Sequence, residues 1–209
     1  MLIFSFENEL NVAKAACEKN GLRCDTARKF DRRLADYSPW HTILAGTNTM
    51  DYWRSKEEAQ PEAFNHLEQF VKGGGHLMIL GSYNARGTQH LKRFGIETSF
   101  YQNDNFLPVG RATDLLFEGN AELVPNNGRM RSYGDFSVKA PHVVLLKNGE
   151  GHRAGSPKLA TLVHGKGRVT YTLVEPNQTS GMWLITVLLS WTSRGSPIPA
   201  EGVDSQAPI

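Results

Sequence analysis

A serine at the end of an apolar run is the residue best placed for chemistry in this sequence. Ser82 belongs to the turn GSYN at residues 81–84, which follows the run HLMIL at 76–80. A serine hydroxyl on such a turn attacks a substrate when a base lies within hydrogen-bond reach. The turn departs from a Gly-x-Ser-x-Gly elbow, because Asn84 stands at the second glycine position. The alternative is a serine that caps the next helical segment or hydrogen-bonds within its own turn.

The same turn offers side chains that suit a polar ligand. Tyr83, Asn84 and Arg86 bring a ring, an amide and a guanidinium close together in the sequence. Such a set can bind a sugar or a carboxylate, because it combines an apolar face with several hydrogen-bond donors. An ordinary polar surface turn is the alternative interpretation.

A carboxylate candidate follows a late strand-like segment. Glu175 can orient a histidine or bind a hydroxyl, and the alternative is a solvated carboxylate at a strand end. Glu7 and Asn8 follow the first apolar run, and Asn48 follows the third. Ligands of doubly wound sheets bind outside the carboxyl ends of the strands. We therefore expect these residues to line one crevice with Ser82, and the catalytic candidates are Ser82 and Glu175 alone.

The elements that would position these residues alternate between strand and helix. Apolar runs predict strands at 2–6, 22–27, 40–45, 76–80 and 96–101, another at 143–146, and a hairpin at 158–163 and 168–174. Helical spacing predicts a helix after Asn8, one at 61–72 and a last one after Ser180. The helix at 61–72 ends in three glycines, 73–75, which stop it and lead into the next strand. This order predicts an α/β fold with a parallel sheet.

Three stretches of the chain resemble one superfamily. They are residues 37–46, a strand followed by glycine; 67–82, LEQFVKGGGHLMILGS; and 165–175, GKGRVTYTLVE. In this order and spacing they are similar to the class I glutamine amidotransferase-like superfamily, including its trehalose-utilisation (ThuA)-like branch. The resemblance implies a flavodoxin-like, doubly wound, mostly parallel α/β sheet flanked by helices, with a late β-hairpin at one edge.

The resemblance also implies a site, and this chain departs from it. Catalytic members need a cysteine on the elbow after the strand and a His-Glu pair after a late strand. Here Ser82 occupies the elbow, Glu175 has no histidine beside it, and neither cysteine follows a strand. The chain is thus expected to lack glutaminase activity and to act as a ligand-binding or protein-interaction module. The alternative is a divergent ThuA-like enzyme of carbohydrate or carboxylate metabolism that uses the crevice of Ser82 and Glu175.

Composition excludes several other classes. The chain has 209 residues, a formal net charge of +2 and 21% charged residues, which is ordinary for one globular domain. The basic segment 28–33 is interpreted as a solvated face, so no nucleic-acid partner is expected. The apolar segment 182–191 is too short to cross a bilayer. The seven histidines show no metal-ligand spacing, and no cofactor motif occurs.

The two cysteines and the termini complete these expectations. Cys17 and Cys24 are interpreted as buried free thiols, which fits a reducing compartment and a cytoplasmic location. The start of the chain lacks the pattern of a signal peptide. We expect a single domain over 1–193 and a disordered tail over 194–209. The partner is an unknown small molecule or protein, and self-association is left open.

Two further features remain ambiguous in the sequence. Trp40, Tyr52, Trp53 and Tyr101 could form an aromatic platform for a sugar or a partner, although such residues more often belong to a core. The stretch 102–141 is rich in Gly, Asn and Pro and is expected to be irregular apart from a helical turn at 113–117. Such a segment could serve as a docking surface in a larger assembly.

Overall fold

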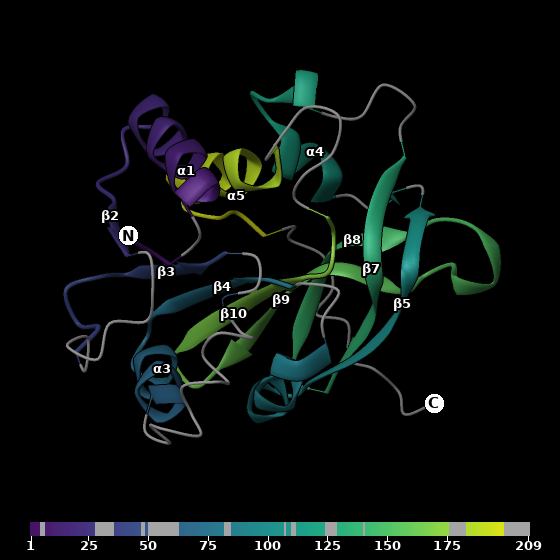
Figure 1. Cartoon of the computed structure of the whole chain (residues 1–209), viewed down its shortest axis with the longest axis horizontal. Helices are drawn as coiled ribbons and strands as arrows, with labels where there is room; N and C mark the ends of the chain where they lie inside the picture. The colour runs from purple at the N-terminus through teal and green to yellow at the C-terminus, as the bar shows by residue number, and fades with distance from the viewer. Residues whose placement is uncertain are drawn as a thin grey trace.

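The fold was obtained as a computed structural model. It describes residues 1–4, 7–27, 36–46, 49, 63–81, 85–106, 108–109, 112–123, 129–139, 141–175 and 183–198. For Glu7, Asn8, Arg86 and Tyr101, among others, the backbone alone is described. Within these ranges, one eight-stranded sheet has the order β2–β1–β3–β4–β10–β9–β8–β6, and β5 and β7 form a separate pair. Helices cover both faces of the large sheet (Figure 1).

One half of the large sheet is parallel, as the sequence predicts. It contains β1 (Leu2–Phe4), β2 (Asp25–Ala27), β3 (Thr42–Ala45), β4 (His76–Leu80) and β10 (Gly167–Thr172). The register pairs Phe4 with Ala45, and Leu80 with Thr172, so neighbouring strands end at one edge. β1, β3 and β4 read as largely apolar runs because both faces are covered, whereas β10 also carries the buried threonines Thr170 and Thr172.

The other half of the sheet is antiparallel. It contains β9 (Pro157–His164), β8 (His142–Asn148) and the short β6 (Pro108–Val109). The predicted hairpin forms between β9 and β10. It lies inside the sheet and not at its edge, because β10 also pairs with β4, and β8 and β6 continue the sheet beyond β9. The fold is therefore a mixed, mostly parallel α/β sheet flanked by helices.

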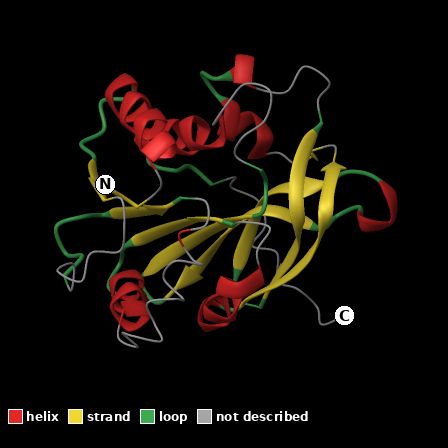
Figure 2. Cartoon of the chain, in the orientation of Figure 1, coloured by secondary structure: helices red, strands yellow, loops and turns green. Residues whose placement is uncertain are grey.

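The helices divide the core into two layers (Figures 1 and 2). On one face, α1 (Glu7–Lys19) and α5 (Trp183–Ser193) cover inward residues of the strands such as Ile3, Leu44 and Met78, with α4 (Ala112–Phe117) beside α5. On the other face, α3 (Ala63–Lys72) and the 3-10 segment η1 (Ala85–Phe94) cover Ile43, Leu77 and their neighbours. Short 3-10 turns follow at Ala121–Leu123 and Gly151–Arg153.

The stretch 102–141 is more regular than its composition predicts. It holds the end of β5 (Ile96–Phe106), then β6 and α4, and the nine-residue β7 (Met130–Val138), which pairs antiparallel with β5. Along β7 every second residue is buried, but two of these positions are Ser132 and Gly134. Burial therefore alternates along β7, whereas hydrophobicity alternates only weakly. For this reason the residue pattern does not predict the strand.

The two cysteines are joined, contrary to the prediction of free thiols. Cys17 lies near the end of α1 and Cys24 directly before β2, and their sulfurs form a disulfide. The helix stops at Asn20 and Gly21, and Gly21 adopts a φ of 65°. This reversal brings the Cα atoms of the two cysteines to 6.3 Å, a proximity that their spacing alone does not reveal.

The end of the described chain packs against α5. Arg194 donates to the carbonyl oxygen of Leu115, and Trp191 Nε1 donates to that of Pro197. The predicted disordered tail therefore begins with residues that make contacts, and its part beyond 198 lies outside the described residues. No helix in the described ranges combines the length and the apolar character that a membrane crossing requires.

Candidate functional site

The carboxyl edge of the parallel strands is where the sequence places the crevice. β1, β3, β4 and β10 all end there. α1 begins at Glu7, shortly after β1 ends at Phe4. The side chains of Glu7, Asn8 and Arg86 are not described, and Asn48, Ser82, Tyr83 and Asn84 lie outside the described residues. The prediction that these residues share one crevice therefore stays a prediction.

Glu175 is the predicted site residue whose side chain the structure describes. Its backbone N–H donates to the carbonyl oxygen of Arg131 over 2.9 Å. Its Oε2 atom lies 3.2 Å from Arg131 Nε in an ion pair, and the side chain is 15% exposed. The carboxylate is thus largely enclosed and paired with Arg131 on β7, and it is not a freely solvated carboxylate at a strand end.

A buried ion pair close to this edge was not foreseen. Lys158 on β9 is fully buried, and its Nζ atom lies 2.6 Å from Asp135 Oδ1 and donates to the carbonyl oxygen of Gly134 at 3.1 Å. Ser156 Oγ also donates to Asp135 Oδ1, over 2.8 Å. A buried ammonium requires such partners, so this cluster fastens β7 to the large sheet. The feature of the sequence that could have indicated this cluster is Lys158, a single lysine in a largely apolar strand.

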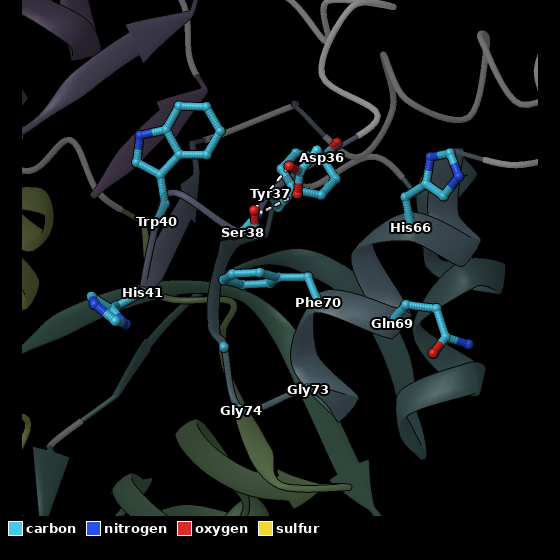
Figure 3. A pocket seen from close by; sticks show the side chains of 11 residues that line it. Asp36, Tyr37, Ser38, Trp40, His41, His66, Gln69, Phe70, Gly73 and Gly74 are labelled. Carbon is cyan, nitrogen blue, oxygen red and sulfur yellow. Dashed lines mark hydrogen bonds between the residues drawn. The ribbon is translucent and has the colours of Figure 1, made fainter.

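A cavity that is partly open to solvent lies at the opposite, amino edge of the sheet. It has a volume of about 460 Å³ and is formed where β3 and β4 begin (Figure 3). The segment before β3 supplies Asp36, Tyr37, Ser38, Trp40 and His41. The end of α3 supplies His66, Gln69 and Phe70, and the turn after it supplies Gly73–Gly75. Because Phe70 lies at the centre of this view, we call the cavity the Phe70 pocket.

Local hydrogen bonds hold the segment before β3 in place. Asp36 accepts hydrogen bonds from the backbone N–H and the hydroxyl of Ser38, at 2.8 and 2.9 Å. These bonds hold the pKa of the Asp36 carboxyl below its usual range. Trp40 Nε1 donates to Asp25 Oδ2 over 2.7 Å, which ties the indole to β2. This wall of the pocket is therefore pre-organised by hydrogen bonds within the protein.

The aromatic floor depends on a glycine. Tyr37 is buried and meets Phe70 edge to face, with ring centroids 6.0 Å apart. Burial raises the pKa of the Tyr37 hydroxyl, which keeps it protonated. A Cβ atom on Gly75 would lie 2.3 Å from the Phe70 ring. The glycine run thus ends α3, as predicted, and also makes room for the Phe70 ring.

The pocket offers a ligand aromatic faces together with polar groups. Phe70 and Trp40 present apolar rings, while Asp36, Gln69 and two histidines present acceptors and donors. Trp40 belonged to the predicted aromatic platform, but Tyr52 and Trp53 lie outside the described residues, and the side chain of Tyr101 is not described. Sequence reasoning missed this site because it looked for ligands at the carboxyl edge.

The third stretch of the resemblance has a structural role at this same edge. The turn Gly165-Lys166-Gly167 packs against the end of α3, where Lys166 N–H donates to the carbonyl oxygen of Lys72. A Cβ atom on Gly167 would lie 2.2 Å from the backbone oxygens of Gly75 and Val71. Only glycine permits this approach.

Comparison with known proteins gives similar folds at low sequence identity. No protein-family model matches the chain, and no curated protein matches it. A cytoplasmic protein from Salmonella typhimurium LT2 superposes with a TM-score of 0.60 at 11% identity, over 93% of this chain and 99% of that one. A β-galactosidase from Bacillus circulans sp. alkalophilus gives a TM-score of 0.55 at 13% identity, and an exo-β-1,4-mannosidase from Opitutaceae bacterium strain TAV5 gives 0.54 at 14%.

The extent of these matches differs. The β-galactosidase and the mannosidase each match 93% of this chain, which spans only 31% and 33% of their own lengths. The chain thus corresponds to about a third of each glycosidase and to nearly all of the Salmonella protein. At these identities the likeness concerns the fold alone.

Proposed function

We propose that this chain is an amidotransferase-like α/β domain without glutaminase activity, which binds a small polar ligand in the Phe70 pocket. The order β2–β1–β3–β4–β10 of the parallel strands supports a flavodoxin-like relationship, because it corresponds to the order 2-1-3-4-5 of that fold. The absence of glutaminase activity is supported by the sequence of the elbow, which carries Ser82 where a cysteine would be needed.

The single observation that carries the binding function is the composition of the Phe70 pocket. Aromatic rings can stack on the apolar face of a sugar, while Asp36 and Gln69 can hydrogen-bond its hydroxyls. Two of the similar folds occur in enzymes named for β-galactosides and β-1,4-mannosides, which makes galactose and mannose sensible first probes. The proposed ligand class is therefore a sugar or a sugar-like ring.

Ligand titration followed by NMR tests this proposal. Galactose or mannose should shift resonances of the segments 36–41 and 66–75 and leave those of β8 unchanged. Gln69→Ala should weaken binding roughly two- to tenfold, because it removes one hydrogen-bonding side chain from the lining. Asn65→Ala is the matched control, since Asn65 is an exposed amide on the same helix outside the lining. Equal affinities of both variants, or no shifts with either sugar, would contradict the proposal.

An enzyme at the carboxyl edge is the second candidate. The observation in its favour is that Glu175 Oε2 is buried and has no hydrogen-bond partner within the described residues, despite the ion pair with Arg131. Such an atom could accept a hydrogen bond from a substrate. Hydrolysis of nitrophenyl esters and glycosides by the wild type, abolished in both Ser82→Ala and Glu175→Gln, would establish this candidate. The absence of turnover would leave the binding function.

The cytoplasm stays the proposed location, on the support of similar folds from proteins described as cytoplasmic. Disulfides are rare in that compartment. The proposal therefore requires Cys17 and Cys24 to be reduced in the cell, although they are joined in the structure. Alkylation of the protein in intact cells, followed by mass spectrometry, distinguishes two alkylated thiols from a disulfide.

A further inference from the structure

A second cavity adjoins the Phe70 pocket at the amino edge. Its volume is about 440 Å³, and it shares His41 and Gly74 with that pocket. Lys166 and Arg168 come to it from the start of β10, and Thr192 and Ser196 from the end of α5 and the residues after it. We call it the Arg168 cavity. Because the two cavities share these residues, a ligand bound in the Phe70 pocket could extend into the Arg168 cavity.

The lining of the Arg168 cavity is cationic. Lys166 and Arg168 bring basic side chains to it, and among the described residues no aspartate or glutamate belongs to the lining. His76, which also lines the cavity, is neutral at physiological pH, since burial and the Arg168 charge lower its pKa to about 3. His76 therefore contributes a hydrogen-bonding nitrogen, which is shared with Thr170 Oγ1 at 2.8 Å.

The Arg168 side chain is held in place by its neighbours. Arg168 N–H donates to the carbonyl oxygen of Gly75 at 3.1 Å, next to the tight contact of Gly167 with α3. The guanidinium lies 5.7 Å from the ring of Trp191, and its Nη1 donates to the carbonyl oxygen of Ser196. A guanidinium has five N–H donors, and the described hydrogen bond uses one of them.

The negative ends of two helices also face this edge, and they would oppose an anion. Carbonyl oxygens in their last turns are hydrogen-bonded, however: that of Lys72 accepts from Lys166 N–H, and that of Trp191 accepts from Ser196 N–H. The full charges of Lys166 and Arg168 also exceed the partial negative charge of about 0.5 at each helix C-terminus.

We propose that the Arg168 cavity binds the anionic group, a carboxylate or a phosphate, of a ligand whose ring lies in the Phe70 pocket. The ligand class is then an acidic sugar, either a uronic acid or a sugar phosphate. This inference rests on the proposed function for the position of the ring, whereas the anion site itself follows from the Arg168 cavity alone. Arg168 would bind the anion directly, and Lys166 would add charge at the entrance.

Four probes separate the parts of this proposal: galactose, galacturonate, galactose 6-phosphate and inorganic phosphate. The acidic sugars should bind at least tenfold more tightly than galactose at low salt, and the gain should shrink as salt rises. Inorganic phosphate alone should shift the resonances of residues 166–168. Comparison of galacturonate with galactose 6-phosphate tells which anion the site prefers, and binding of either supports the proposal.

Charge-removing variants provide the decisive comparison. Lys166→Gln, at an exposed position, should weaken galacturonate three- to tenfold and leave galactose unchanged, and Arg168→Gln should remove most of the gain. Lys147→Gln is the matched control, because Lys147 is an exposed lysine on β8 away from the cavity. Thermal melting confirms that each variant is folded.

Equal affinity for galactose and galacturonate, or phosphate shifts unchanged in Lys166→Gln and Arg168→Gln, would overturn the inference. Phosphate binding at 166–168 without galactose binding would instead refute only the ring site.

Discussion

Breaking the ion pair between Lys158 and Asp135 should destabilise the fold more than any exposed pair does. Lys158 is fully buried, the Asp135 side chain is 18% exposed, and the two charges are 2.6 Å apart. At an effective dielectric of about 20 their gross attraction is on the order of 6 kcal/mol. Asp135→Ala removes the carboxylate from beside the ammonium, which keeps its hydrogen bond to the carbonyl oxygen of Gly134. The net loss should be about 3 kcal/mol, the lower end of the range for broken buried pairs, because Asp135 keeps some solvent.

Urea unfolding followed by circular dichroism measures this effect. With a slope of about 2–3 kcal/mol per M, the midpoint of Asp135→Ala should fall by roughly 1 M. The matched control is Glu97→Ala, which breaks the pair between Lys139 and Glu97, also 2.6 Å long but exposed. Its midpoint should not move measurably. The double variant Asp135→Ala with Lys158→Met should recover part of the loss, because no charge is then left buried.

Two results would refute this reasoning. In the first, Asp135→Ala shifts the midpoint no more than Glu97→Ala does, which would show that burial does not govern the cost. Alternatively, the double variant could be less stable than Asp135→Ala, which would show that Lys158 contributes through its position and not through its charge. The first result would leave the attachment of β7 to the large sheet without an energetic explanation.

Two further predictions concern pH and redox state. The pKa of His76 is lowered from 6.5 to about 3, so the stability that its neutral form gives is complete above pH 6.5 and is lost as the pH falls toward 3. Unfolding free energies should fall by about 2.5 kcal/mol between pH 6.5 and 4.5 on account of this group, and urea titrations of His76→Gln should show a correspondingly flatter profile. Reduction of the Cys17–Cys24 disulfide should cost roughly 2 kcal/mol, because the bridge closes a short loop. Thermal melting with and without reductant checks this value. The double variant Cys17→Ser with Cys24→Ser should be insensitive to reductant. A reductant effect that persists in this variant would disprove that the effect comes from the Cys17–Cys24 disulfide.

The parallel strands and their helices were predictable because burial there follows residue type. Ile43 and Leu77 are buried by α3 and Leu44 and Met78 by α1 and α5, so β3 and β4 are apolar after their first residue. Phe64, Leu67 and Val71 recur at helical spacing on the side of α3 that faces the sheet. In β7 the same rule fails, since Ser132 and Gly134 occupy inward positions without being apolar.

The predicted site and the described cavities diverge for a different reason. The sequence directs attention to residues after strands, and of that set Glu175 is the one with a described side chain, engaged by Arg131. The Phe70 pocket instead depends on which turn meets which helix end. Nothing local indicates that the bonds between Asp36 and Ser38 face Phe70, or that Gly75 leaves space for its ring.

The sequence by itself determined the alternation of strands and helices, the glycine stop after α3 and the lack of an elbow cysteine. These properties depend on residue type and on spacing along the chain, which are local quantities. Only the tertiary structure decided that Cys17 meets Cys24, that Lys158 meets Asp135, and that the two cavities share His41 and Gly74. Each of these depends on distances between separate elements, which are set by how the strands order themselves in the sheet and how the helices pack upon it.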